Sequence, residues 1–279
     1  MELSAGAPAT KPLDVGMRRM LLVASALVFI VGIQLFVLSE QTDRYFAWTV
    51  APPLTAAFLG AAFWAAGILE LLAARQRVWA SARIAVPAVL LFTTLTLLAT
   101  LLHLDRFHLD TASGWVWLAV YVAVPPVMLA LFVRQLRVPG DDPPRRAPLP
   151  RWLRLVLGLQ AALLLVVGAV LFLAPQLTAP LWPWMLTPLT ARAVAAWLLA
   201  LGLGAAHLIR ENDWERGRVA MPSSAVLGAL ELVALARYPD ALDWSGPRAW
   251  VFLLFVVSIL AVGLYGWRAA ARVPSREPG

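Results

Sequence analysis

Eight apolar segments, each about 20 residues long, alternate with short connectors along this sequence. A helix needs about 20 apolar residues to cross a hydrocarbon layer about 30 Å thick, and every segment reaches that length. No segment alternates apolar and polar residues as a barrel strand does, so each must satisfy its backbone hydrogen bonds as a helix. We therefore expect eight transmembrane helices, near residues 18–39, 52–74, 84–104, 115–136, 152–173, 188–209, 219–238 and 249–269.

The composition predicts the same fold class, an all-α integral membrane protein. Hydrophobic residues make up 61% of the chain and charged residues only 14%, with a mean hydropathy of +0.76. A soluble domain has a far larger charged fraction. Cysteine is absent, which excludes disulfides, thiolate metal sites and a cysteine nucleophile. No signal-peptide cleavage site follows the first apolar segment, so we expect that segment to be a retained first span.

The basic residues lie mostly on one side of the predicted helices. Eighteen of the 23 lysines and arginines fall in the tails and in every second connector, and the other five are Arg44, Arg106, Arg192, Arg237 and Arg248. Because cytoplasmic loops carry the excess of basic residues, we expect both termini in the cytoplasm of a bacterial inner membrane. The net charge of +7 then reflects topology and an affinity for anionic lipid headgroups, and we expect no nucleic-acid partner.

An internal repeat divides the chain into two halves. The connector at residues 75–87 recurs at 210–222, an offset of 135 residues. Identical pairs at this offset are Arg75 and Arg210, Trp79 and Trp214, Arg83 and Arg218, Pro87 and Pro222, and the P-L-T-A runs at 53–56 and 188–191. We expect two parallel four-helix repeats, at 1–137 (with a tail at 1–17) and 151–279, joined by a Pro-rich cytoplasmic linker at 138–150. With an even number of spans in each half, the repeats should be related by a pseudo-two-fold axis along the membrane normal.

Two stretches resemble sequences of uncharacterised multi-spanning bacterial inner-membrane proteins. They are F-A-W-T-V-A-P-P-L-T-A at residues 46–56 and L-H-L-D-R-F-H at residues 102–108. The resemblance covers most of the chain. It implies a polytopic membrane fold and brings no activity, cofactor or assigned residue with it.

Glu231 is the charged residue placed deepest in a predicted span, within the seventh helix. An intramembrane carboxylate costs a few kcal/mol to insert and needs a partner, for which we expect Arg192 of the sixth helix. Its counterpart in the first half is Thr96, and Thr93, Thr96 and Thr100 share one face of the third helix, so we expect both helices to face the interior. Two interpretations remain. The carboxylate binds a proton or substrate in a cavity between the halves, or a Glu231–Arg192 pair only fixes packing.

An outer loop at residues 103–110 holds two of the three histidines. The side chains of His103, Asp105, His108 and Asp110 offer nitrogen and oxygen ligands suited to zinc. Their spacing matches no strong metal motif, and only Asp105 has an identical counterpart in the second half, so a plain polar turn is the alternative. We assign no metal site from this pattern.

Three further features have structural interpretations. The pair Pro125-Pro126 should kink or break the fourth helix. Glu70 and His207 lie near cytoplasmic helix ends, where we expect them to extend to water. The repeated connector is either a docking or headgroup-binding surface, or a boundary in which arginines anchor the helices and tryptophans lie in the interfacial belt.

Absent motifs narrow the function classes. The chain contains no Walker A sequence, no G-x-G-x-x-G fingerprint and no H-E-x-x-H, so we expect neither ATP hydrolysis nor a cofactor. Haem ligation by two histidines is also disfavoured, since His207 lies on the side opposite His103 and His108. We expect a carrier or permease-like protein with a polar path between the third and seventh helices. The alternatives are an accessory subunit of a membrane complex with an unknown partner and, less favoured, an outer-leaflet enzyme.

Overall fold

The computed structural model describes residues 10–273, which form helices and loops without any β-strand. The ends of the two predicted cytoplasmic tails, residues 1–9 and 274–279, lie outside the described residues. Eight helices in the described part are long and apolar enough to cross a membrane, which confirms the predicted number. They are α1 (Val15–Gly32) with its π-helical extension η1 (Ile33–Val37), α3 (Pro53–Ala74), α5 (Ala85–Leu102), α6 (Ala112–Arg137), α7 (Arg151–Leu173), α9 (Pro188–Glu211), α11 (Ala220–Arg237) and α12 (Pro247–Ala271).

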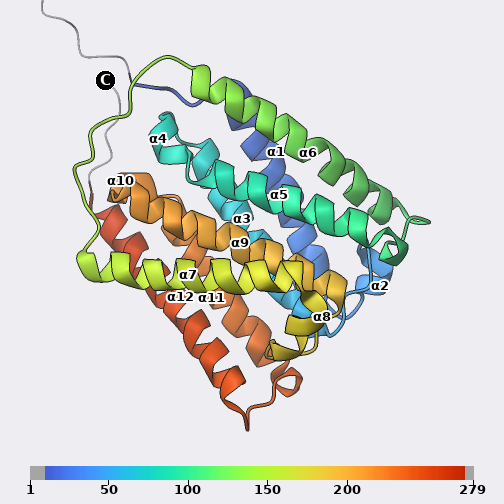
Figure 1. The fold of residues 1–279 in the computed structure, drawn as a ribbon. Helices are drawn as coiled ribbons and strands as arrows, with labels where there is room; N and C mark the ends of the chain where they lie inside the picture. Colours follow the sequence, from blue (N-terminus) through green and yellow to red (C-terminus); the bar gives the residue numbers. More distant parts are fainter. Residues whose placement is uncertain (1–9, 274–279) are drawn as a thin grey trace, which may run out of the picture.

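Short helices occupy the connectors. They are α2 (Thr42–Tyr45), α4 (Trp79–Ala82), η2 (Leu104–Arg106), α8 (Pro175–Thr178), η3 (Ala179–Leu181), α10 (Trp214–Gly217) and η4 (Pro239–Ala241). Figure 1 shows α4 and α10 at one end of the bundle and α2 and α8 at the other. We call the first the arginine-rich end, because the predicted cytoplasmic connectors lie there, and the second the opposite end.

Local sequence signals set several helix boundaries. Asp14 caps α1 by accepting hydrogen bonds from the backbone N–H groups of Gly16 and Met17. Thr187 and Thr190 form a reciprocal capping box at the start of α9, and Asn212 ends that helix in the left-handed conformation with φ 44°. These signals fix where each apolar run begins and ends as a helix.

The helix α6 is continuous through Pro125 and Pro126. Of the two expected outcomes, a kink or a break, the continuous helix rules out the break. Each proline removes one backbone donor, but the rest of the 26-residue helix keeps its hydrogen-bonded register on both sides of the pair.

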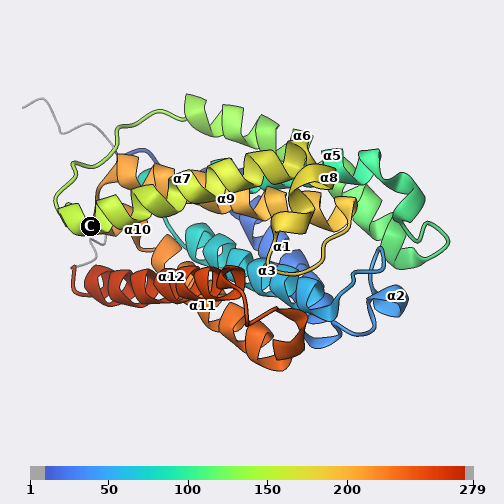
Figure 2. The same cartoon turned by 60° about the horizontal axis from the view of Figure 1, so that its bottom comes forward.

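The helices α3 and α9 form the centre of the bundle. α1 packs on α3 and α7 packs on α9, while α11 packs on α3 and α5 on α9. The outer helices α6 and α12 lie beside α5 and α11, respectively. Figures 1 and 2 show this arrangement from two directions. The third long helix, α5, thus packs on α9, and the seventh, α11, packs on α3. Each faces the interior because it contacts the central helix of the other half.

The same elements recur along the chain at the 135-residue offset. The helices α4, α5, η2 and α6 begin 135 residues before α10, α11, η4 and α12. Close helix contacts recur too, because glycines let the neighbouring side chains approach the backbone. These contacts are Gly32 against Trp64, Gly67 against Phe29, Gly168 against Leu199 and Gly202 against Leu165.

The two connector tryptophans are buried, which differs from their expected place in an interfacial belt. Trp79 is 3% exposed and Trp214 is 7% exposed. The short helices α4 and α10 contact each other. The indole of Trp79 and that of Trp214 each pack into a cluster of buried apolar side chains. Pro87 and Pro222 lie in the first turns of α5 and α11.

Candidate functional site

Glu231 lies on α11 and is 3% exposed. Its carboxylate forms no hydrogen bond or ion pair with any residue in the described range 10–273, and its Oε1 is fully enclosed. The predicted ion pair with Arg192 is therefore not formed. Burying a charged group without a partner costs several kcal/mol, so this carboxylate lacks the compensation that a structural ion pair would give.

A cavity of about 310 Å³ adjoins Glu231. Helices α7, α9, α11 and α12 form its walls together with α3. Residues lining it include Phe58, Leu163, Leu227, Val251, Phe252 and Ile259. Apart from Glu231 and Arg248, the lining side chains are apolar or aromatic. The cavity therefore accepts an apolar body and presents one deep carboxylate to it.

The cavity opens on the side of the bundle between α7 and α12. Leu163 of α7 and Val251 of α12 line the cavity and are also exposed on the bundle surface. At the opposite end, the exposed Arg248 lies at the rim and donates a hydrogen bond to the carbonyl of Pro180 at 3.1 Å. The cavity therefore borders the lateral face of the bundle, while Glu231 lies inside it.

Arg192 pairs with His103 instead of Glu231. Its Nη1 donates to Nε2 of His103 at 2.7 Å, and its Nε is buried without a partner in the described chain. The pKa of His103 is lowered by burial first and by the Arg192 guanidinium second; Arg106 also lowers it, and Asp105 opposes the shift. Neutral His103 is thus the form that accepts this hydrogen bond.

The threonines of α5 are buried but do not join Glu231. The hydroxyl of Thr93 donates to the Leu90 carbonyl at 3.2 Å, and the hydroxyl of Thr96 is buried without a partner within residues 10–273. Thr93 lines a second cavity, and neither threonine lines the Glu231 cavity. The polar side chains predicted to form one path between the third and seventh helices therefore do not line a common cavity.

Glu70 is a site residue that the sequence reasoning missed. It lies on α3, is only 2% exposed, and lines the second cavity. The expectation that it extends to water is wrong, because α3 is a central helix whose surroundings are other helices. Because Glu70 lies only four residues before the end of α3, the sequence alone suggested that its side chain could reach water. A sequence signal existed, since Glu70 is flanked by apolar residues on both sides.

The four candidate side chains of the outer loop do not converge on one point. Among the described residues, no group of three or more His, Asp or Glu side chains is placed to hold a metal ion. His103 contacts Arg192, and the ring of His108 contacts the hydroxyl of Thr49 at 3.2 Å. Asp105 pairs with the neighbouring Arg106 at 3.0 Å, and Asp110 is exposed.

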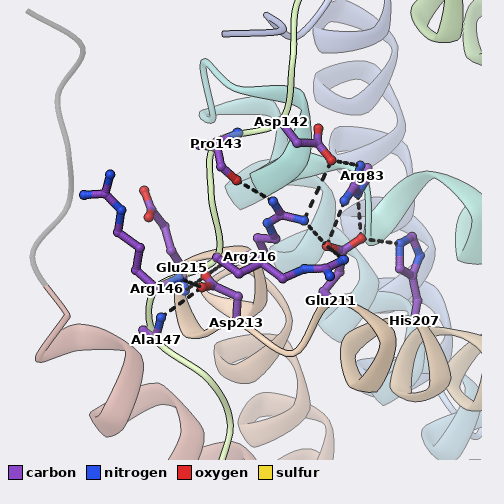
Figure 3. A network of polar contacts seen from close by, with 11 residues as sticks. Arg83, Asp142, Pro143, Arg146, Ala147, His207, Glu211, Asp213, Glu215 and Arg216 are labelled. Atoms are coloured by element: carbon purple, nitrogen blue, oxygen red, sulfur yellow. Dashed lines mark hydrogen bonds and ion pairs between the residues drawn. The ribbon is translucent and has the colours of Figure 1, made fainter. Parts of the chain in front are cut away.

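A dense ionic network joins the two halves at the arginine-rich end (Figure 3). Arg83 donates from Nε and Nη2 to both carboxylate oxygens of Glu211, at 2.7 and 2.8 Å, and from Nη1 to Asp142 at 2.6 Å. Arg216 donates to Glu211 at 2.5 Å, and His207 lies 3.2 Å from it. The pKa of Arg83 is raised because its pairing with Glu211 and Asp142 outweighs the opposing effect of burial.

The predicted linker takes part in this network and is fastened to the bundle. The carboxylate of Asp213 accepts the backbone N–H groups of Arg146 and Ala147 at 2.8 and 3.1 Å. The carbonyl of Pro143 accepts from Arg216 at 2.6 Å. Of the connector arginines, Arg83 and Arg216 thus form ion pairs within the protein, and Arg218 donates to the carbonyl of Val273 at 2.7 Å.

Comparison with known proteins found no matching family model, no similar curated protein and no similar solved structure.

Substitution of Arg83 by methionine should destabilise the protein. The change leaves Glu211, whose side chain is 3% exposed, with fewer cationic partners. We expect a loss of about 2–4 kcal/mol in the free energy of unfolding, measured by thermal unfolding of the detergent-solubilised protein. The control is Arg210→Met at an exposed position, for which we expect a change within about 0.5 kcal/mol. Equal effects of the two substitutions would contradict the importance of the network.

The His103–Arg192 contact should make stability depend on pH. Because the pKa of His103 is lowered in the folded state, its contribution is present above the usual value of 6.5 and is lost as pH falls through the folded pKa. We expect the unfolding midpoint of the wild type to fall more, from about pH 7 to about pH 5, than that of His103→Gln. Glutamine still accepts from Arg192 but does not titrate. Parallel pH profiles would show that this histidine is not the responsible group.

Proposed function

We propose that this chain is a multi-pass membrane protein that binds and carries a small amphipathic molecule at the Glu231 cavity. The eight long apolar helices suggest the membrane location. The observation that carries the functional proposal is a buried carboxylate without a protein partner on the wall of a cavity of about 310 Å³. Such a group is expected at substrate pathways, because structural carboxylates in apolar surroundings have cationic or hydrogen-bonding partners.

The cavity favours a ligand with an apolar body and one cationic or hydrogen-bond-donating group. An ionised carboxylate only accepts hydrogen bonds, so its natural complement is an amine. The opening between α7 and α12 faces the surrounding hydrocarbon if the helices span a membrane, and a lipophilic amine partitions into that layer. We propose a lipophilic amine as the ligand class.

We also propose that the chain consists of two parallel four-helix repeats. The recurring boundaries of α4, α5, η2 and α6 in α10, α11, η4 and α12 support this. The matched crossings of α1 with α3 and of α7 with α9 support it as well. Under this proposal Glu231 and most residues that line its cavity belong to the second repeat, and Glu70 and most residues that line its cavity belong to the first.

An accessory subunit could bind a ligand in the same cavity, but it would not transport that ligand across the membrane. A measurement of ligand flux therefore distinguishes a carrier from an accessory subunit. The outer-leaflet enzyme has no support from the outer loop, since its four candidate side chains do not converge.

The proposed topology places the arginine-rich end in the cytoplasm of a bacterial inner membrane. Because the chain has no cysteine, single-cysteine variants report on one position each. We expect Asp110→Cys to react with a membrane-impermeant maleimide in intact spheroplasts and Arg146→Cys to react only after permeabilisation. Both positions are exposed, so accessibility within the protein is matched. The reverse labelling pattern would invert the topology.

The ligand class can be tested by displacement of a hydrophobic fluorescent probe from the protein in lipid nanodiscs. We expect decylamine to displace the probe at a concentration about tenfold lower than decanoic acid of the same chain length, a preference that Glu231→Gln should abolish. Val167→Phe fills the cavity without touching the carboxylate and should lower binding of the probe itself. Probe binding that both variants leave unchanged would place the ligand elsewhere.

Carrier activity follows from exchange in proteoliposomes. We expect radiolabelled decylamine to equilibrate faster through wild-type protein than through Glu231→Gln, beyond the flux of protein-free vesicles. If the protein binds decylamine but does not increase its flux, the carrier function is wrong and the accessory-subunit interpretation is favoured.

A further inference from the structure

The second cavity, at Glu70, has about 90 Å³ of space and lies among α1, α3, α5, α6, α9 and α11. One water needs roughly 10–15 Å³ of such space, so the cavity has room for several water-sized groups. Its volume excludes the long apolar ligand proposed for the Glu231 cavity. Ala62 and Leu201 line both cavities, which therefore share part of a wall but present different carboxylates.

Glu70 has no partner within the described residues that would neutralise its charge. It is 2% exposed, its Oε2 is enclosed without a hydrogen bond, and it forms none of the ion pairs of the described chain. No lysine, arginine or histidine lines the cavity. The position lacks a cation, and the free space beside it can hold one.

Other oxygen atoms in the wall are free to accept hydrogen bonds. The hydroxyl of Thr93 donates to the Leu90 carbonyl and the hydroxyl of Ser223 donates to the Ala65 carbonyl at 2.7 Å, which leaves the lone pairs of both oxygens available. Tyr121, which is buried, also lines the cavity. Together with Glu70 these groups suit a donor that carries several N–H bonds.

Aromatic side chains complete the wall. Phe92 stacks on Trp197 with ring centroids 3.9 Å apart, and Phe92 lies 6.3 Å from Tyr121. Aromatic rings attract organic cations, whereas a small metal ion requires more oxygen ligands than this wall supplies. The combination of one carboxylate, hydroxyl oxygens and aromatic rings therefore favours an ammonium-type cation over a metal ion.

We propose that the Glu70 cavity is a second binding site, specific for a small ammonium cation such as ammonium or methylammonium. Glu70 is the counter-ion, Thr93, Ser223 and Tyr121 accept its N–H groups, and Phe92 and Trp197 form the apolar side of the site. The site is independent of the Glu231 ligand, since it uses a different carboxylate on a different helix.

The test is thermal unfolding of the purified full-length protein in chloride salts of equal ionic strength. Relative to sodium chloride, we expect ammonium and methylammonium to raise the unfolding midpoint by about 3 °C or more at concentrations well above the dissociation constant. Glu70→Gln, which keeps the shape of the side chain, should lose this shift. Glu231→Gln is the matched control and should keep it.

The proposal would be overturned by no difference between sodium and methylammonium in the wild type, by an undiminished shift in Glu70→Gln, or by loss of the shift in Glu231→Gln alone. A size series on the wild type keeps the test independent of how well a variant folds. Tetraethylammonium is too large for the cavity and should produce no shift. A shift equal to that of methylammonium would refute binding in this cavity.

Discussion

The cost of removing a carboxylate from water is the constraint on which the polar organisation of this bundle depends. Glu211, Glu70 and Glu231 are all at most 3% exposed. Glu211 is surrounded by Arg83, Arg216 and His207, and its buried charge is compensated within the protein. Glu70 and Glu231 have no such partners in the described chain, and both lie beside free space. Because the three carboxylates are about equally buried, the lack of a partner at Glu70 and Glu231 indicates two positions where a ligand could supply the missing partner.

The polar groups differ between halves that otherwise share their helix order. At the 135-residue offset, Glu231 corresponds to Thr96, and Glu70 corresponds to Ala205. Each half thus places its carboxylate on a different helix, α11 or α3, beside cavities of about 310 and 90 Å³. The helix crossings that contain glycine occur in both halves, whereas the carboxylates beside the cavities are not shared. Under the two proposals, one scaffold would hold two chemically distinct sites.

Hydropathy predicted the helices well because span length depends only on the local run of apolar residues. The predicted and observed bounds differ by a few residues, as between 84–104 and Ala85–Leu102. The partner of Arg192 could not be predicted, because it depends on which face α9 turns toward α5 and α11. Packing rotates that face toward His103. The burial of Glu70 and Trp79 escaped prediction for a similar reason, since distance from a helix end does not report which neighbours cover a side chain.

Contacts between the halves at both ends constrain how a ligand reaches Glu231. The Arg83–Glu211 pair joins the halves at the arginine-rich end. At the opposite end, Trp184 donates to the hydroxyl of Thr55 at 2.9 Å, and Arg237 donates to the carbonyl of Phe36. Rocking one half against the other, as in many carriers, would break contacts at one of these ends in each direction. The opening between α7 and α12 requires no such motion, because both helices belong to the second half. For the proposed lipophilic ligand, this arrangement therefore favours lateral exchange with the lipid phase as the access route.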